Sequence, residues 1–388
     1  MSAKQLLVVG AGFAGLEAVA ALRRRAPDAE VTLIDANSYA TMVPALPDIV
    51  SGRIPQNAFA TPLSEVVDPA VRLVQDRIEA VDLKRRVLSG GKESYNYELL
   101  ILAAGSKPNF FGFEPEGGTL HSVHSYPAAL SFRHAFEEKA RSGARPEVVI
   151  VGGGYTGLEV AASLRYGTRE SGVEPRIRIV ELAEEIVTFL PEKIRRRIKE
   201  YLQDRQIELL TGTSLERLVG ETAHLSNGER VENALVCWSA GMRASQDEVE
   251  GNVARARDGR LETNEFLQLP EHPEVFVAGD AAALKKEEQP LRRAVNFSIY
   301  SGRRAGMNAA ALVGGERLRP FKPVDLGWVI PLSEISTGRV LGSMPVGGSL
   351  GLRLHYFMCG FRHWGARRTW EFYRTAARLS RKPGSMEL

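Results

Sequence analysis

Two glycine motifs of the form G-x-G-x-x-G begin 142 residues apart in this chain of 388 residues, at Gly10 and Gly152. In a strand–turn–helix unit, the first glycine of such a motif permits a tight turn, and the second lets the backbone approach a pyrophosphate. The third lets the helix pack on the strand, so that the phosphates meet the positive N-terminus of the helix. The motifs therefore predict two dinucleotide-binding loops.

Strands and helices are predicted where each loop needs them. The elements on either side of the two loops are the strands Gln5–Val9 and Glu147–Val151 and the helices Leu16–Ala26 and Leu158–Tyr166. The next strand of each unit ends on an acid, Asp35 after Val31 and Glu181 after Ile177. Such carboxylates accept hydrogen bonds from an adenosine ribose, so both units are predicted to bind a dinucleotide.

The segments between and after the two loops are predicted to complete both units, and the chain returns from the second unit to the first. Tyr39–Pro62 indicates a loop with short helices, three strands are expected at Val71–Val74, Val81–Leu88 and Leu99–Leu102 with a turn at Gly90-Gly91, and Phe110–Gly118 indicates a linker. A helix at Pro127–Arg141, strands within Ile207–Trp238 and a buried strand at Val275–Ala278 follow. The predicted fold class is α/β, with two Rossmann-like, doubly wound dinucleotide-binding domains, the second inserted in the first. The predicted boundaries are 1–113, 114–249 and 250–330, followed by a C-terminal strand pair and tail at 331–388.

The composition predicts a globular protein that does not span a membrane. Hydrophobic residues make up 44% and charged residues 25% of the chain, and no run of eighteen apolar residues occurs. The only cysteines are Cys237 and Cys359, so the sequence predicts no disulfide framework, no C-x-x-C pair and no zinc or iron–sulfur site. Any redox chemistry is expected to come from organic cofactors, in a cytoplasmic protein.

The C-terminal segment differs from the rest in charge and aromatic content. From Gly351 to Leu388 there are eight Lys or Arg and two Glu, and seven of the 29 aromatic residues of the chain. Residues at helical spacing form one apolar face: Leu350, Leu354, Phe357, Phe361 and Trp364, with Trp370, Tyr373 and Ala377 beyond Gly365. This amphipathic, basic helical tail is expected to contact an anionic membrane, or alternatively to pack on the body or on a second subunit of a homodimer. The arginine runs 23–25 and 195–197 are interpreted as solvated helix faces without a nucleic-acid motif.

Two further segments complete a family resemblance. Ile101–Asn109, ILAAGSKPN, is similar to a strand and glycine turn at a domain crossing, and Val275–Ala281, VFVAGDA, is similar to a second FAD signature. With the glycine motifs, the chain resembles over nearly its whole length the two-dinucleotide-binding-domain flavoprotein disulfide-reductase-like superfamily, and within it the type II NADH dehydrogenases. The resemblance implies an FAD-dependent enzyme that passes electrons from NADH to a quinone without proton pumping, peripheral on the inner face of the cell membrane.

The resemblance also assigns cofactors to residues. FAD would be held by Gly10, Gly12, Phe13, Ala14, Gly15, Asp35, Ala104, Gly105, Gly279 and Asp280. NADH would be held by Gly152, Gly154, Tyr155, Thr156, Gly157, Glu181, Ala240 and Gly241. Asp280 has an alternative role as the N-cap of a helix that starts at Ala281. Glu181 favours NADH, because a carboxylate would repel the 2′-phosphate of NADPH, although Arg176 and Arg178 are close in sequence.

The resemblance implies three residues that act on the acceptor side. Thr156-Gly157-Leu158-Glu159 is similar to the family's Thr-Gly-x-Glu, whose glutamate lies near the flavin, so Glu159 is expected to have a raised pKa and to relay protons. Its alternative role is a favourable interaction with the helix N-terminus. Asn296 and Tyr300 stand where the family has two glutamines beside the quinone, which leaves amide and hydroxyl donors in a pocket of different shape. A soluble acceptor or protein partner, and a non-catalytic NADH sensor, stay open as alternatives to quinone reduction.

Overall fold

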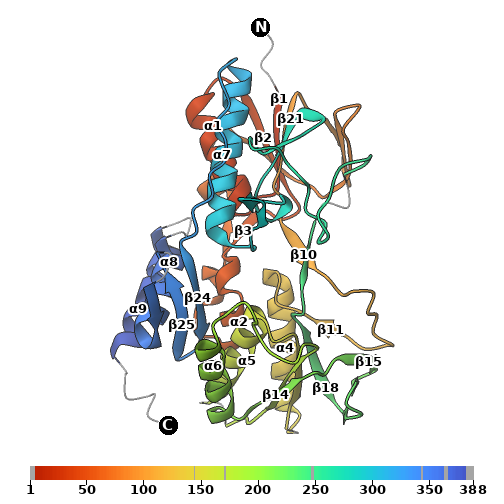
Figure 1. Ribbon diagram of the computed structural model, residues 1–388, viewed down its shortest axis with the longest axis vertical. Helices are drawn as coiled ribbons and strands as arrows, with labels where there is room; N and C mark the ends of the chain where they lie inside the picture. The colour runs from red at the N-terminus through yellow and green to blue at the C-terminus, as the bar shows by residue number, and fades with distance from the viewer. Residues whose placement is uncertain are drawn as a thin grey trace. The chain divides into compact units, whose positions relative to one another are not determined.

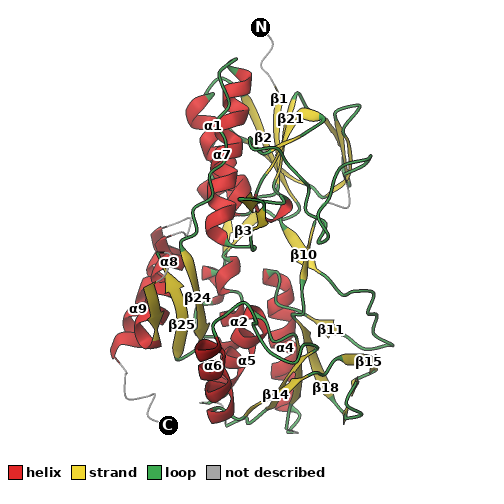
Figure 2. Ribbon diagram, viewed as in Figure 1, coloured by secondary structure: helices red, strands yellow, loops and turns green. Residues whose placement is uncertain are grey.

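The computed structural model describes residues 5–143, 145–169, 172–245, 249–341, 344–361 and 366–381. The chain forms two compact units, each with its own parallel sheet and helices (Figure 1, Figure 2). Unit 1 consists of Met1–Ala40, Thr61–Lys107 and Met242–Leu326, and unit 2 of Thr41–Ala60, Pro108–Gly241 and Gly327–Leu388. The fold class expected from the sequence, two Rossmann-like units, is confirmed. The main segment of unit 2, Pro108–Gly241, is inserted between segments of unit 1.

The sheet of unit 1 has six strands in the order β20-β21-β9-β1-β2-β5. Their bounds are β20 Gln268–Leu269, β21 His272–Val277, β9 Leu99–Leu102, β1 Gln5–Val9, β2 Glu30–Asp35 and β5 Arg72–Gln75. All neighbours are parallel except β20 and β21. The central strands are almost continuously apolar and buried, as expected for parallel strands that are covered on both faces.

Two helices of unit 1, α1 (Phe13–Arg25) and α7 (Val295–Val313), pack closely on one another. A Cβ atom added to Gly302 would lie 2.1 Å from the carbonyl oxygen of Ala14, and one added to Gly306 would lie 2.3 Å from that of Ala18. The absence of side chains at both glycines therefore allows the backbones to approach. This packing holds the start of α7 beside the first glycine loop.

The region from residue 71 to 102 contains more strands than the sequence predicts. After β5 come β6 (Ile78–Asp82), β7 (Val87–Gly90) and β8 (Ser94–Asn96), which form an antiparallel sheet. The prediction of one strand from Val81 to Leu88 is wrong, because Asp82 Oδ1 accepts a hydrogen bond from the amide of Arg85 (2.9 Å) and Arg86 has a φ of 56°. A hairpin turn thus interrupts an alternating pattern that continues on both sides of it.

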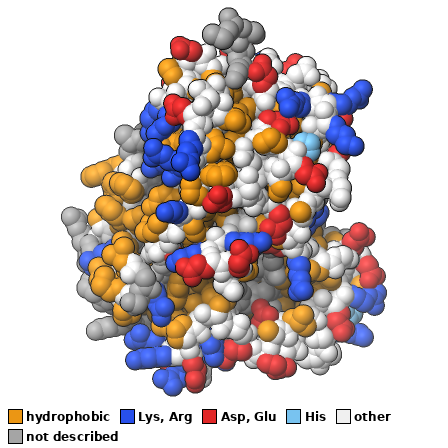
Figure 3. Space-filling model, turned by 45° about the horizontal axis from the view of Figure 1, so that its top comes forward, with side chains coloured by type: hydrophobic (Ala, Val, Ile, Leu, Met, Phe, Trp, Pro, Cys, Tyr) orange, Lys and Arg blue, Asp and Glu red, His pale blue; other side chains and the backbone are white. Residues whose placement is uncertain are grey.

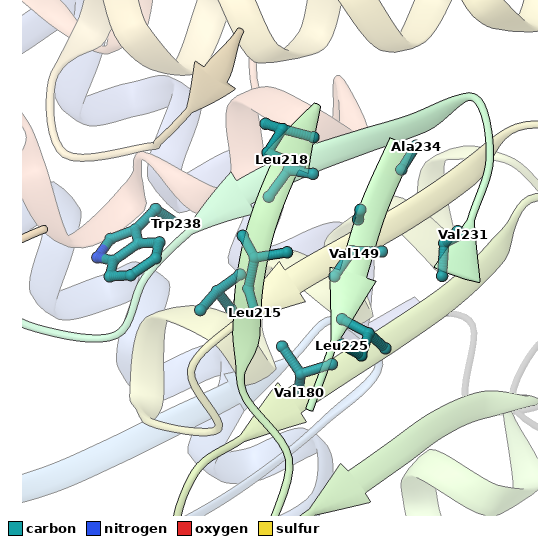
Figure 4. Close-up of a cluster of buried hydrophobic side chains, with 11 residues drawn as sticks. Val149, Val180, Leu215, Leu218, Leu225, Val231, Ala234 and Trp238 are labelled. Atoms are coloured by element: carbon teal, nitrogen blue, oxygen red, sulfur yellow. The ribbon is translucent and has the colours of Figure 1, made fainter. Parts of the chain in front are cut away.

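The sheet of unit 2 is wholly parallel, in the order β11-β18-β12-β13-β14. The bounds are β11 Leu120–His121, β18 Ala234–Trp238, β12 Glu147–Val151, β13 Arg176–Glu181 and β14 Ile207–Thr211, with the helices α4 Tyr126–Arg141, α5 Tyr155–Gly167 and α6 Glu192–Asp204. The helix expected at Pro127–Arg141 is confirmed, and the Ser125 side chain caps it by accepting a hydrogen bond from the amide of Ala128 (3.3 Å). Buried Val, Leu and Ala side chains of this sheet and of the small sheet formed by residues 215–231 build a hydrophobic core with Trp238 (Figure 4).

The other elements are short strands and the C-terminal helices. They are β3 Tyr39–Thr41, β4 Ala60–Pro62, α2 Pro47–Ser51, α3 Leu63–Val66, β10 Ser106–Pro108, β15 Leu215–Val219, β16 Thr222–Leu225, β17 Arg230–Val231, β19 Met242–Ala244, β22 Lys285–Lys286, β23 Gln289–Pro290, β24 Gly327–Leu332, β25 Ile335–Val340, β26 Met344–Gly347, α8 Gly348–Phe361 and α9 Ala366–Arg381, with 3-10 helices η1 Val43–Ala45, η2 Gln56–Ala58 and η3 Gly279–Ala281. Within unit 2, α2 packs on α5, where a Cβ atom on Gly167 would lie 2.8 Å from Ser51 Cα. Residues 41–60, expected as a loop with short helices, therefore belong to the nucleotide-binding core of unit 2.

Candidate active site

The first glycine loop joins β1 to α1 in unit 1. Gly10 has a φ of 100°, and a Cβ atom on it would lie 2.4 Å from the carbonyl oxygen of Ala103, while one on Gly15 would lie 1.8 Å from that of Gly10. A Cβ atom on Gly12 would have no neighbour within 4 Å. The first and third glycines are thus required by the chain itself, whereas the space beside the second is open to a ligand.

The second loop, between β12 and α5 in unit 2, repeats this geometry. Gly152 has a φ of 108°, and its Cβ atom would lie 2.7 Å from Ala240 Cα; that of Gly157 would lie 2.0 Å from the carbonyl oxygen of Gly152. Beside Gly154 there is again no atom within 4 Å. Each unit therefore presents a backbone surface at a helix N-terminus that a pyrophosphate fits, which is the arrangement required by a dinucleotide.

The two acids at the strand ends are held by the loops in the same way. Asp35 Oδ2 accepts a hydrogen bond from the amide of Ala11 (2.7 Å), and Glu181 Oε2 accepts one from the amide of Gly153 (2.7 Å). Both side chains are half-buried. Each carboxylate is fixed beside its loop and keeps acceptor capacity for the hydroxyls of a ribose.

Asp280 lies in η3, directly after β21, with Gly279 packed against Ala14. Ser106 Oγ donates to Asp280 Oδ2 (3.1 Å) and Ser298 Oγ lies 3.5 Å from Oδ1. Burial raises the pKa of Asp280, and the positive charge of Arg293 opposes this only in part. The alternative N-cap role of Asp280 is wrong, since it caps no helix: the residue before η3 is Ala278, and no side chain caps this 3-10 helix.

The other residues assigned to the first cofactor surround the same loop. Phe13 and Ala14 are buried in the first turn of α1, whereas Ala104 is exposed and Gly105 has a φ of 75° with no atom near its Cβ position. Asn296 and Tyr300 lie one turn apart at the start of α7. Asn296 is buried, and its Nδ2 donates to the carbonyl oxygen of Val324 (2.8 Å), which leaves one N–H of the amide for another partner.

The residues assigned to the second cofactor lie within unit 2. Tyr155, at the start of α5, contacts the rings of Phe189 and Trp328 at centroid distances of 5.1 and 6.0 Å, and Thr156 is exposed. Ala240 and Gly241 follow β18, and Ala240 abuts Gly152. All of these predicted residues are at the loop, and their contacts with a nucleotide stay a prediction.

The two arginines of β13 are occupied by other carboxylates. Arg178 is buried and forms ion pairs with Glu147, Glu208 (3.1 Å) and Glu229 (3.3 Å). Arg176 pairs with Glu208 as well (3.2 Å). Both arginines therefore pair with glutamates other than Glu181.

Glu159 lies in the second turn of α5 and is half-buried. Burial raises the pKa of Glu159 well above the ordinary value of a glutamate, and the negative charge of Asp48 raises it further. The raised pKa expected from the sequence is thus present in this structure. Its position beyond the first turn weakens the alternative role of a helix N-terminal charge.

The charge beside Glu159 belongs to a network that the sequence did not reveal. Tyr356 of α8 donates to Asp48 Oδ1 (2.8 Å), and Arg53 Nη1 donates to the Tyr356 hydroxyl (2.7 Å). The Arg53 guanidinium lies 4.0 Å from the centroid of the Tyr166 ring and 3.9 Å from Asp48. Burial raises the pKa of Asp48, and Arg53 opposes this. Residues of α2, α5 and α8 thereby contribute to one buried polar cluster. The only sign of this cluster in the sequence was the presence of Asp48 and Arg53 within the apolar stretch 43–54.

Replacing Tyr356 with phenylalanine is expected to lower the free energy of unfolding by about 1–3 kcal/mol, because it leaves the buried Asp48 and Arg53 without their shared hydroxyl. Denaturant titration measures the loss. The matched control is Tyr166→Phe, which keeps the ring below the guanidinium. Equal stability of Tyr356→Phe and Tyr166→Phe would show that the hydroxyl network contributes nothing.

The cysteines are structural. Cys237 is buried in β18, and burial raises the pKa of its thiol to about 12. Cys359 is buried in α8, 3.7 Å from His355 Nε2. A thiol buried in this way packs as a small hydrophobic side chain.

The C-terminal helices expose part of the apolar face that the sequence singles out, whereas Leu354 and Tyr373 of that face are half-buried. Leu350, Phe357, Phe361 and Trp370 are between 50% and 68% exposed, whereas Leu352 and Tyr356 on the other side of α8 are buried. Hydrophobic side chains gather at the left of the view in Figure 3, where grey marks residues that are not described. Trp364, also expected in this face, lies outside the described residues. Among the described helices, none combines the length and the apolar character needed to cross a bilayer.

Comparisons with known proteins identify a family whose matched region contains both glycine loops. The sequence pattern of the pyridine nucleotide-disulphide oxidoreductase family matches residues 4–302. An NADH dehydrogenase-like protein of Mycobacterium tuberculosis is 30% identical over 352 residues, which cover 86% of each chain. A type II NADH:quinone oxidoreductase of Staphylococcus aureus is 26% identical over 377 residues, 89% of this chain and 91% of the relative. The solved structure of NDH2 from Plasmodium falciparum in complex with NADH has the same fold, with a TM-score of 0.83 at 14% identity over 97% of this chain and 98% of that one.

Proposed function

This chain belongs to the pyridine nucleotide-disulphide oxidoreductase family, and from that membership we propose that it is a type II NADH dehydrogenase that reduces a quinone. FAD would bind at the loop Gly10–Gly15 and NADH at the loop Gly152–Gly157. The observation that carries the proposal is the repeated geometry of the two loops, each with an open second glycine and an acid bonded to the loop backbone. The relatives of M. tuberculosis and S. aureus support it.

The residues of unit 1 fit a flavin dinucleotide. Asp280 is a half-buried carboxyl held by Ser106 and Ser298, and a cofactor hydroxyl would satisfy its remaining acceptor capacity. When bound, FAD would accept a hydride from NADH and pass electrons on, so no protein nucleophile is required. The role of the protein would be to orient each cofactor and to exclude water.

NADH is favoured over NADPH by the charges around the second loop. Glu181 would repel a 2′-phosphate, and both nearby arginines are paired with glutamates of the sheet. Binding of the extra phosphate would require a cation that the described part of this loop does not offer.

The acceptor is proposed to receive protons through Glu159. Reduction of a quinone to a quinol consumes two protons, and a carboxyl whose pKa is raised by burial and by Asp48 keeps its proton to a higher pH than an ordinary glutamate does. Asn296 and Tyr300 would orient the acceptor with an amide and a hydroxyl. The second candidate acceptor is a soluble molecule. It is favoured by the hydrogen bond from the Asn296 amide to Val324, because this bond leaves only one N–H of the amide to hold a quinone.

Stopped-flow spectroscopy tests the proposal. We expect NADH to bleach the flavin within seconds, a short-chain quinone to reoxidise it rapidly, and NADPH to act with a lower kcat/KM. Failure of NADH to reduce the flavin would remove the dehydrogenase proposal, and fast reduction with slow reoxidation by every quinone would select the soluble acceptor.

The exposed face of α8 and α9 is proposed to contact the cytoplasmic surface of the cell membrane. It combines large apolar side chains with the basic excess of the C-terminal segment, the combination that binds anionic lipid interfaces. This location would give the enzyme access to a lipid-soluble quinone of the respiratory chain. Packing on a second subunit is the alternative.

Replacing both Phe357 and Phe361 with serine is expected to weaken binding to anionic liposomes by about tenfold or more, because each exposed ring would lose its burial in lipid. Liposome sedimentation measures the partition. Leu312→Ser, which changes an exposed apolar side chain of α7, is the matched control. If the double variant sediments with liposomes as the control does, the face does not bind membrane, and a change in oligomeric state would instead assign it to a subunit interface.

A further inference from the structure

A cavity of about 580 Å³ lies in unit 1, lined by the end of α1, the second half of α7 and the segments 265–266 and 316–320. It takes in no residue assigned to either cofactor or to the acceptor. Its volume is within the range of roughly 300–1,000 Å³ that is typical of sites for small molecules. The cavity therefore needs an explanation that the proposed oxidoreductase activity does not provide.

The charges around this cavity are unbalanced. Four arginines and two glutamates line it, and Arg25 pairs with Glu316 (3.8 Å). The side chains of the other three arginines, at 304, 317 and 319, form no hydrogen bond or ion pair with another described residue. Burial and the nearby charges of Arg319 and Arg25 lower the pKa of Arg304, so like charges are held together there at an electrostatic cost. An anion between them would relieve this repulsion.

The arginine-bearing segment is fixed to the helix by one buried amide. Asn308 of α7 donates through Nδ2 to the carbonyl oxygens of Phe266 (3.0 Å) and Arg319 (2.9 Å), and its Oδ1 accepts from the amide of Arg319 (3.0 Å). These bonds hold the backbone of residue 319 against α7, beside Arg304. The backbone that carries Arg319 is thus fixed before a ligand binds, which reduces the entropy lost on binding.

Apolar side chains also line the cavity. Phe266, Met307, Leu318 and Pro320 are all half-buried and face the same cavity. A ligand that matches both kinds of side chain combines an apolar part with an oxyanion. Guanidinium groups bind phosphate oxygens in a bidentate manner, and an aromatic ring such as that of Phe266 stacks on a base.

We propose that this cavity is a second, non-redox binding site for a nucleoside phosphate, with the phosphates on Arg304 and Arg319 and the base on the apolar side. Bound at the ends of α1 and α7, such a ligand would act on the helix pair that carries the first glycine loop and Asn296. The site is separate from both glycine loops, so the proposal does not depend on the oxidoreductase activity.

Equilibrium dialysis of the FAD-bound protein with radiolabelled ADP tests the proposal. Saturating NAD⁺ occupies the second loop, and the same measurement on Gly154→Leu excludes binding there. We expect one ADP per chain both in the NAD⁺-saturated protein and in Gly154→Leu. Charge reversal by Arg304→Glu or by Arg319→Glu is expected to weaken ADP binding by about tenfold or more. Because Arg319 is exposed, its variant tests the site even if Arg304→Glu does not fold.

Arg24→Glu is the matched control, since Arg24 is exposed, adjacent to Arg25 and outside the cavity lining. It carries the same change in net charge and is expected to bind ADP within about twofold of the unaltered chain. Absence of ADP in the presence of NAD⁺, or equal loss in Arg24→Glu and Arg319→Glu, would overturn the proposal. Inorganic pyrophosphate that binds as tightly as ADP would also overturn it, because the apolar side would then recognise nothing.

Discussion

Replacing Gly154 with leucine is expected to raise the KM for NADH by on the order of a hundredfold while the unfolding temperature stays unchanged. The Cβ position of Gly154 has no neighbour within 4 Å, so the chain itself accommodates a side chain there. The same side chain would occupy the space through which a pyrophosphate reaches the backbone amides of the loop and the N-terminus of α5. Steady-state kinetics and thermal unfolding measure the two quantities.

Gly157→Ala is the matched comparison, because even a methyl group at this position would lie 2.0 Å from the carbonyl oxygen of Gly152. It is expected to lower the unfolding temperature, since the loop and α5 have to move apart. The two substitutions thus separate a ligand space from a packing contact within one motif. Unchanged NADH kinetics in Gly154→Leu would contradict the assignment of this loop to NADH.

Replacing Glu159 with glutamine is expected to lower kcat for quinone reduction by about a hundredfold, the usual contribution of a general acid, while flavin reduction by NADH is unaffected. Hydride transfer needs no protein acid, whereas the reduced acceptor needs protons. Separate stopped-flow measurements of the two half-reactions detect the difference. Glu138→Gln, at an exposed glutamate of α4, is the control.

The pH dependence of stability provides a second, independent test of Glu159. Because its pKa is raised in the folded state, the folded protein binds a proton there that the unfolded chain has released. The stability of the unaltered chain therefore falls as the pH rises from the ordinary pKa of a glutamate to the raised one. Glu159→Gln removes this loss, so we expect the variant to unfold at a higher temperature at neutral pH.

Asp48→Asn tests the cause of the raised pKa. Removing the negative charge of Asp48 lowers the pKa of Glu159, so the alkaline limb of the kcat profile for quinone reduction is expected to move to lower pH. The pH profile of flavin reduction by NADH should not move. An unmoved alkaline limb in Asp48→Asn would show that another group controls proton delivery.

Short-range features were predictable from the sequence. The glycine loops, the strand before each and the acid after each depend on local steric rules and on a fixed number of residues per strand and helix. Gly10, Gly15, Gly152 and Gly157 are accordingly in the tight contacts that the motif requires. The hairpin at Asp82–Val87 was missed because alternation continues through a turn, which pattern alone does not detect.

The sequence by itself therefore determined the two nucleotide-binding units and the positions of Asp35 and Glu181, because short stretches of backbone encode them. Only the tertiary structure decided which charges meet. Asp48 and Tyr356 are 308 positions apart, and their hydrogen bond exists because α2 packs on α5 while α5 and α8 both pack on β24. The same packing decided that Tyr356 is buried while Phe357 remains exposed on a helix with apolar residues on both sides. Such contacts form when burial of apolar surface brings distant parts of the chain together and closes long loops. A local sequence pattern does not predict which distant parts will meet.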